Sequence, residues 1–106
     1  MDSQEYLFFL KSVLIKIENT INLIDQTPSK HIPAYHKMLG VQQKFLGLDK
    51  TDRCRFLPQI IKVRGIINYL TNGSYGRASE QIFKLKGEIV QICVNINNEK
   101  VTNTKE

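Results

Sequence analysis

Apolar residues recur at every third or fourth position through most of the chain, and this spacing constrains the fold more than any other feature. A helix places residues with this spacing on one face, which must be buried against other helices. The pattern runs in four stretches, separated by Thr27 to Ser29, by Gly47 and by Asn72 to Ser74. Proline and glycine interrupt a helix, so these positions predict turns. Four amphipathic helices with short loops predict an all-α fold, an antiparallel up-and-down four-helix bundle.

The expected helices cover residues 3–25, 33–46, 51–70 and 77–97. Asp2 is expected to cap the first helix, and Thr51 with Asp52 the third, because their side chains can accept from the free N–H groups of a first turn. Pro58 lies several residues inside the third stretch. It therefore predicts either a kink or a short lead-in turn before the main part of that helix.

The last stretch admits a second interpretation, because Val90 to Ile96 also alternates as a strand does. The helical period covers a longer part of the chain than the alternation, so a helix is predicted. The sequence after it is polar and lacks a cap. We therefore expect residues 1–97 to form the bundle and residues 98–106 to form a mobile tail.

The predicted core consists of the apolar stripes of the four helices, together with both cysteines. Cys54 and Cys93 fall in separate helical stretches, with no CxxC spacing and no neighbouring pair of histidines. They are interpreted as small core residues in a reducing compartment, and neither a disulfide nor a metal site is expected. The apolar stripes also place Leu46 and Leu57 in the core.

The charge of the chain is uneven. The 106 residues suit one domain, and they carry a formal net charge of +5. Residues 1–52 hold six lysines and six acids, whereas residues 53–106 hold nine Lys and Arg and four acids. This asymmetry indicates either a solvated basic face or an acidic partner, such as anionic lipid or nucleic acid.

The start of the chain predicts a cytoplasmic location, and the basic half leaves open a peripheral position on the anionic inner face of the membrane. The apolar run from Tyr6 to Leu10 is too short to span a bilayer. Asp2 and Glu5 are also unlike the cationic start of a signal peptide.

Residues for catalysis are scarce, so we expect no enzyme, no cofactor, no metal and no small-molecule substrate. His31 and His36 have no acid at helical spacing, and the sequence shows no carboxylate pair or Ser/His/Asp order. His36 followed by Gly40 resembles the phosphotransfer domains of signalling relays, although Leu39 stands where those have Lys. Gly73 to Arg77 precedes a helix but lacks the strand and the Gly-Lys-Ser/Thr of a phosphate loop, so it is interpreted as a helix connection.

The candidate partner-binding residues are those that the core does not use. On the third helix, cations and apolar groups share the face opposite the core stripe: Arg55, Gln59, Lys62, Ile66 and Tyr69. Such a mixture is typical of an interaction surface.

The fourth helix carries a second apolar stripe of Phe83, Val90 and Val94, with Lys86 and Gly87 beside it. Either the helix is buried on two sides, or the stripe docks a partner or the chain's own tail. Both surplus surfaces lie in the basic half. Residues 53–106 are therefore predicted to recognise the partner.

Three segments resemble a known family. They are Phe56-Leu57-Pro58-Gln59-Ile60-Ile61-Lys62-Val63-Arg64, then Asn72-Gly73, and then Gln81-Ile82-Phe83-Lys84-Leu85-Lys86-Gly87-Glu88-Ile89. They are similar to the immunity proteins that protect producers of pediocin-like (class IIa) bacteriocins. Members of that family open their third helix with Leu/Val-Pro-x-aliphatic-aliphatic, continue with a Gly-containing turn and end with a Lys-rich fourth helix.

The resemblance implies a non-catalytic cytoplasmic protein with a four-helix bundle. In that family the toxin uses the mannose phosphotransferase membrane components as its receptor. The immunity protein binds the receptor–toxin complex from the cytosolic side and keeps the pore closed, with the second half of the chain setting specificity. A cationic half disfavours capture of a toxin that is itself cationic, and favours a membrane receptor flanked by anionic lipid.

The main alternative is a basic nucleic-acid-binding bundle. It is disfavoured because Arg55 and Lys62 are the only cations on their face of the third helix, with Tyr69 the sole aromatic residue near them.

Overall fold

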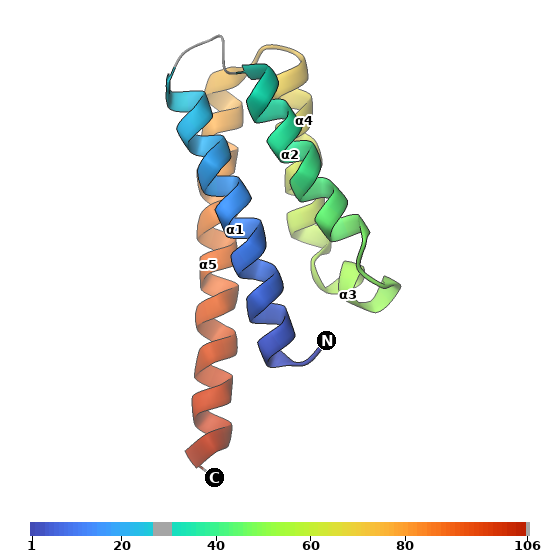
Figure 1. Cartoon of the computed structure of the whole chain (residues 1–106), viewed down its shortest axis with the longest axis vertical. Helices are drawn as coiled ribbons and strands as arrows, with labels where there is room; N and C mark the ends of the chain where they lie inside the picture. The colour runs from blue at the N-terminus through green and yellow to red at the C-terminus, as the bar shows by residue number, and fades with distance from the viewer. Residues whose placement is uncertain (27–30, 106) are drawn as a thin grey trace.

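The chain folds into helices joined by short connections (Figure 1). The computed structural model describes the backbone of residues 1–26 and 31–105, and the side chains of residues 1–24 and 32–99. Its helices are α1 (Ser3–Gln26), α2 (His31–Leu46), α3 (Lys50–Arg55), α4 (Leu57–Thr71) and α5 (Tyr75–Lys105). Every regular element of the described residues is a helix, which confirms the predicted all-α class.

The four longer helices enclose one core. Helix α1 contacts α2 and α5, and helix α4 also contacts α2 and α5. The pair α1 and α5 therefore forms one side of the molecule, and the pair α2 and α4 forms the opposite side. The short helix α3 lies at the same end as the two termini, and the turn between α4 and α5 lies at the other end (Figure 1).

The predicted third helix is two helices. Of the two expected alternatives, the short lead-in is confirmed: α3 ends at Arg55, Phe56 breaks the helix, and Pro58 sits in the first turn of α4, where a missing N–H costs no hydrogen bond. The predicted cap is wrong. Asp49 caps α3 by accepting from the backbone N–H of Asp52 at 2.9 Å, and Asp52 lies buried within α3.

Two of the predicted turns lie where glycine marks them. Helix α2 ends at Leu46, directly before Gly47. After α4, Gly73 has a φ of +83°, a conformation that a residue without Cβ adopts freely, and the N–H of Ser74 donates to the carbonyl of Tyr69 at 2.8 Å. The third turn, Thr27 to Ser29, lies outside the described residues.

Helix α5 is longer than predicted. Val90 to Ile96 is helical, so the helix was the right choice over the hairpin. However, the helix begins at Tyr75 and continues to Lys105, and its predicted end at Asn97 is wrong. The mobility of residues 98–106 stays a prediction, and the side chains beyond Glu99 lie outside the described residues.

Aromatic residues from α1, from α2 and from the α3–α4 junction form the part of the core near α3. The ring of Phe9 lies 5.5 Å from Phe45 and 6.0 Å from Phe56, and Phe45 lies 5.8 Å from Phe56. The Tyr6 ring meets Phe56 edge-on at 5.9 Å. Phe45 and Phe56 are among the largest fully buried side chains. This cluster therefore fixes the junction against α1 and α2.

Three residues expected in the core are exposed: Leu46, Leu57 and Cys54. Leu46 ends α2, Leu57 begins α4 and Cys54 belongs to α3, so all three lie at the corner where the chain turns from one helix to the next. At this corner the side chain of Phe56 is the one that enters the core, and these three side chains stay outside it. Cys93, the other cysteine expected in the core, is half-buried and packs against the core.

Replacing Phe56 by alanine should destabilise the protein by about 3–5 kcal/mol, because it leaves a cavity beside the aromatic rings of α1 and α2. The same substitution at Phe8, whose side chain is 79% exposed, should change the free energy of unfolding by less than about 0.5 kcal/mol. Denaturant unfolding of both variants measures the difference. Equal losses would contradict the assignment of Phe56 to the core.

Candidate partner-binding site

The first group of predicted site residues does not form one exposed face. Gln59 and Ile66 are buried, and Lys62 and Tyr69 are half-buried. Arg55 is exposed, but it belongs to α3, where its guanidinium lies 4.2 Å from the centroid of the Tyr6 ring. The predicted exposure is therefore wrong for Gln59 and Ile66, because α4 packs against both α2 and α5 and so is buried on two sides.

Gln59 and Lys62 join α4 to α5. The side-chain amide of Gln59 donates to Glu88 Oε1 at 3.0 Å, and the ammonium of Lys62 forms an ion pair with Glu88 Oε2. The carboxylate of Glu88 thus holds two residues of the neighbouring helix. The polar groups of Gln59, Lys62 and Glu88 thus bind one another and connect α4 to α5.

Replacing Glu88 by alanine should cost about 1–3 kcal/mol of stability, because Gln59 is buried and loses its acceptor. Glu80→Ala is the matched control: Glu80 is also on α5 and also pairs with a lysine, Lys84 at 3.4 Å, but both side chains are more than half exposed. Its loss should stay below about 0.5 kcal/mol. Thermal or denaturant unfolding distinguishes the two, and a larger loss at Glu80 would be inconsistent with this role of Glu88.

The second group of predicted residues is exposed. Phe83, Val90 and Val94 of α5 are 50%, 42% and 43% exposed. The alternative that this helix is buried on two sides is therefore wrong. Lys86, predicted beside them, is half-buried, and its ammonium lies 3.7 Å from a carboxylate oxygen of Glu18 on α1.

Helix α1 adds two apolar residues that the sequence argument missed. Phe8 is 79% exposed and Ile15 is 60% exposed. They lie seven residues apart, so they share one face of the helix. Their seven-residue spacing is visible in the sequence, but both lie outside the basic half of the chain.

Contacts between α1 and α5 bring these two sets together. Glu18 pairs with Lys86, and α1 and α5 run in opposite directions (Figure 1). Ile15, about one turn before Glu18, is therefore level with Val90, about one turn after Lys86. We use the name α1/α5 face for the exposed apolar residues on this side of the molecule: Phe8, Ile15, Phe83, Val90 and Val94.

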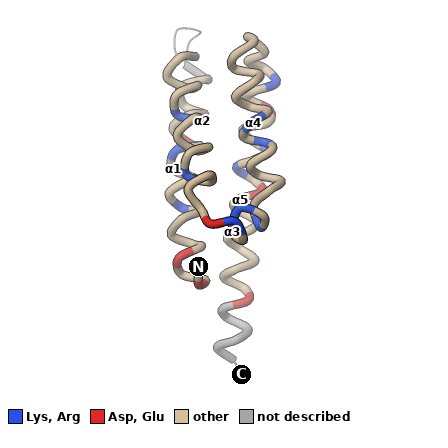
Figure 2. Tube along the Cα trace, turned by 90° about the vertical axis from the view of Figure 1, so that its right-hand side faces the viewer, with Lys and Arg blue, Asp and Glu red and all other residues tan. Residues whose placement is uncertain are grey.

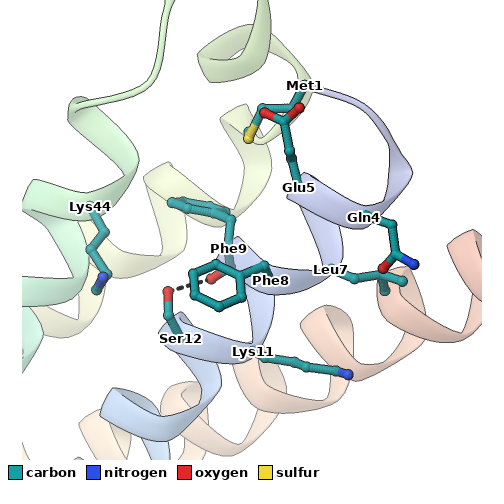
Figure 3. A pocket seen from close by; sticks show the side chains of 9 residues that line it. All are labelled: Met1, Gln4, Glu5, Leu7, Phe8, Phe9, Lys11, Ser12 and Lys44. Carbon is teal, nitrogen blue, oxygen red and sulfur yellow. Dashed lines mark hydrogen bonds between the residues drawn. The ribbon is translucent and has the colours of Figure 1, made fainter.

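A shallow hollow of about 640 Å³ surrounds Phe8 at the start of α1 (Figure 3). Its lining combines apolar side chains of α1, including Leu7 and Phe9, with Lys11 and with Lys44 of α2. The hydroxyl of Ser12 in this lining already donates to the carbonyl of Phe9 at 2.6 Å. The hollow thus adds apolar contact area around Phe8, on α1 and toward α2.

The buried carboxylate of Asp52 has a structural environment. It accepts a hydrogen bond from the Tyr6 hydroxyl, and it lies 3.9 Å from the amino group of Met1. The hydrogen bond to Asp52 is the main reason that the pKa of Tyr6 is raised above its ordinary value, and burial adds to the effect. These contacts attach the start of α1 to α3.

The described residues contain no group of three His, Cys, Asp or Glu side chains placed to hold a metal ion. His36 is exposed on α2, and its ring lies 5.6 Å from that of Tyr35. No helix in the described part of the chain combines the length and the apolar character that crossing a bilayer requires.

The fold and these surfaces define an all-helical protein that exposes apolar side chains on a side formed by two helices. Comparison of the chain with protein-family models, with curated proteins and with solved structures finds no match.

The two cysteines should differ in reactivity. Burial raises the pKa of the Cys93 thiol, with a smaller opposing effect from Lys11, so less of it is thiolate at mildly alkaline pH. Cys54 is exposed. With Ellman's reagent one thiol should react fast and one slowly, and Cys54→Ser should remove the fast phase. A single rate for both thiols would contradict this.

Proposed function

We propose that the chain is a non-catalytic bacteriocin immunity protein, which protects the producing cell from a small pore-forming bacteriocin. The observation that carries the proposal is the α1/α5 face. Apolar patches that remain exposed beside a complete core are typical of sites that bind other proteins. The resemblance of the α4 opening and of the middle of α5 to the class IIa immunity proteins supplies the kind of partner.

The proposed arrangement is an antiparallel up-and-down four-helix bundle in the cytoplasm, with α3 as the lead-in to its third long helix. The contacts of α1 with α2 and α5, and of α4 with the same two helices, support it. In this arrangement α1 and α5 present the exposed apolar residues of the α1/α5 face on neighbouring helices, which suits an apolar segment of a partner.

The proposed partner is the bacteriocin receptor, the mannose phosphotransferase membrane components, in complex with toxin. Phe83, Val90 and Val94 supply the apolar contacts, and Lys86 lies beside them. Phe8 and Ile15 add contact area from outside the half of the chain to which the resemblance assigns specificity. His36 lies on α2, so the phosphotransfer alternative would use a different surface.

A protection assay tests the proposal. Expression of the chain in a sensitive cell should give survival against at least one member of a panel of pediocin-like bacteriocins. Phe83→Gln and Val90→Gln should abolish or weaken protection, because a central apolar contact contributes about 2 kcal/mol or more, which is roughly thirtyfold in affinity. Glutamine is a good helix former, so the helix should persist.

Arg77→Gln and Lys84→Gln are the matched controls, since both are exposed on α5, neither lies three, four or seven residues from a residue of the stripe, and both introduce the same residue. They should leave protection unchanged. Unfolding measurements on all four variants separate lost binding from lost folding. Survival that stays unchanged against the whole panel would contradict the proposed function, and controls as damaging as Phe83→Gln would contradict the proposed face.

A further inference from the structure

The positive charge of the chain belongs to α2, α3 and α4. Residues 31–71 carry a net charge of +5, whereas the remaining residues carry eight cations and eight acids and are neutral. Neither α2 nor α4 contains an acidic residue. The cations of this segment are Lys37, Lys44, Lys50, Arg53, Arg55, Lys62 and Arg64, and its two acids are Asp49 and Asp52.

Both acids of this segment are occupied within the protein. Asp49 caps α3, and Asp52 is buried against the Tyr6 hydroxyl and the chain's amino group. Among the cations, Lys62 is paired with Glu88 and Arg55 lies over the Tyr6 ring. Within the described residues, Lys50, Arg53 and Arg64 form no ion pair.

These three cations surround an apolar hollow at the corner of α2, α3 and α4. The hollow measures about 240 Å³, and Leu46, Leu57 and Ile60 form its apolar part, with Cys54 beside them. Leu46 and Leu57 are exposed, the two leucines that the sequence predicted in the core. Figure 2 shows Lys and Arg gathered on α3 at this corner. We use the name basic corner for Leu46, Lys50, Arg53, Leu57 and Arg64.

We propose that the basic corner docks on the anionic surface of a lipid bilayer. Lys50, Arg53 and Arg64 face the phosphate headgroups, while Leu46 and Leu57 enter the boundary between headgroups and acyl chains. Charge complementarity supports this occupant, because cations without internal partners gain from a negative surface. The exposed leucines distinguish it from nucleic acid, whose backbone would satisfy the cations and leave the leucines in water.

The proposal goes beyond the proposed function and does not depend on it. The basic corner belongs to the side formed by α2 and α4, and the α1/α5 face belongs to the opposite side. The two surfaces share no residue, so each can be changed while the other stays intact.

Sedimentation with vesicles tests the proposal on the full chain. The protein should bind vesicles of phosphatidylcholine with phosphatidylglycerol, and binding should weaken as salt screens the charges. It should bind weakly to phosphatidylcholine alone. Arg53→Gln with Arg64→Gln should lower the partition coefficient roughly 25-fold, at about fivefold for each charge. Arg77→Gln with Lys84→Gln removes the same charge from α5 and should have a much smaller effect, because those residues lie away from the corner.

Leu57→Gln separates lipid from nucleic acid. It removes an apolar side chain and keeps every charge. Vesicle binding should therefore weaken, whereas any binding to a DNA duplex should stay unchanged. A chain that binds the duplex more tightly than anionic vesicles at the same salt, or binds vesicles equally well with and without phosphatidylglycerol, would overturn the proposal. So would equal effects of the two double charge variants. Circular dichroism confirms that each variant is folded.

A probe on Cys54 reports which surface touches the bilayer. Cys54 lies beside the hollow and is exposed, so a polarity-sensitive fluorophore can be attached there in a Cys93→Ser background. Its emission should shift to the blue when vesicles with phosphatidylglycerol are added. Sedimentation with the vesicles without any shift would show that another surface binds, and would overturn the assignment to the basic corner.

Discussion

The burial of Phe56 at the break between α3 and α4 determines most of what is distinctive in this structure. Its ring packs among Phe9 and Phe45, and Tyr6 meets its edge. Because this one residue enters the core where the helix is interrupted, α3 turns across the end of the molecule. That turn carries Cys54 and Leu57 outward beside Arg53. The same contact therefore completes the core and creates the mixed apolar and cationic corner.

The charge distribution is clear only when residues are grouped by helix. A division of the sequence at its midpoint cuts through α3, and it counts Lys37, Lys44 and Lys50 together with the acids of α1. Grouping by helices assigns the whole net charge to residues 31–71, on the side opposite α1 and α5, and the residues outside that segment are neutral in sum. The second half of the chain is thus basic mainly through residues 53–71 and much less through α5. Helix α5 carries three of the five residues of the α1/α5 face.

Local features of the sequence predicted the helices well, because helix periods and glycine turns are local properties. The turns at Gly47 and Gly73, and the lead-in before Pro58, follow from backbone chemistry alone. Burial was predicted less well. Ile66 lies off the main stripe of α4, yet it is fully buried because two neighbours cover the helix. The number of neighbours is a tertiary property, and the same reasoning left the exposure of Phe83 and Val90 open.

The two proposed surfaces together restrict how a partner could approach. A bilayer bound to the basic corner would lie against the side of α2 and α4, so the α1/α5 face would point away from it or across it. A segment embedded in the membrane would reach most of that face less readily. A part of a membrane protein that projects from the bilayer could reach it. Membrane attachment would also concentrate the protein at the surface where such a part is exposed, which raises the effective concentration without any new contact. Under the two proposals together, the α1/α5 face would contact a projecting segment of a receptor more readily than a toxin embedded in the bilayer.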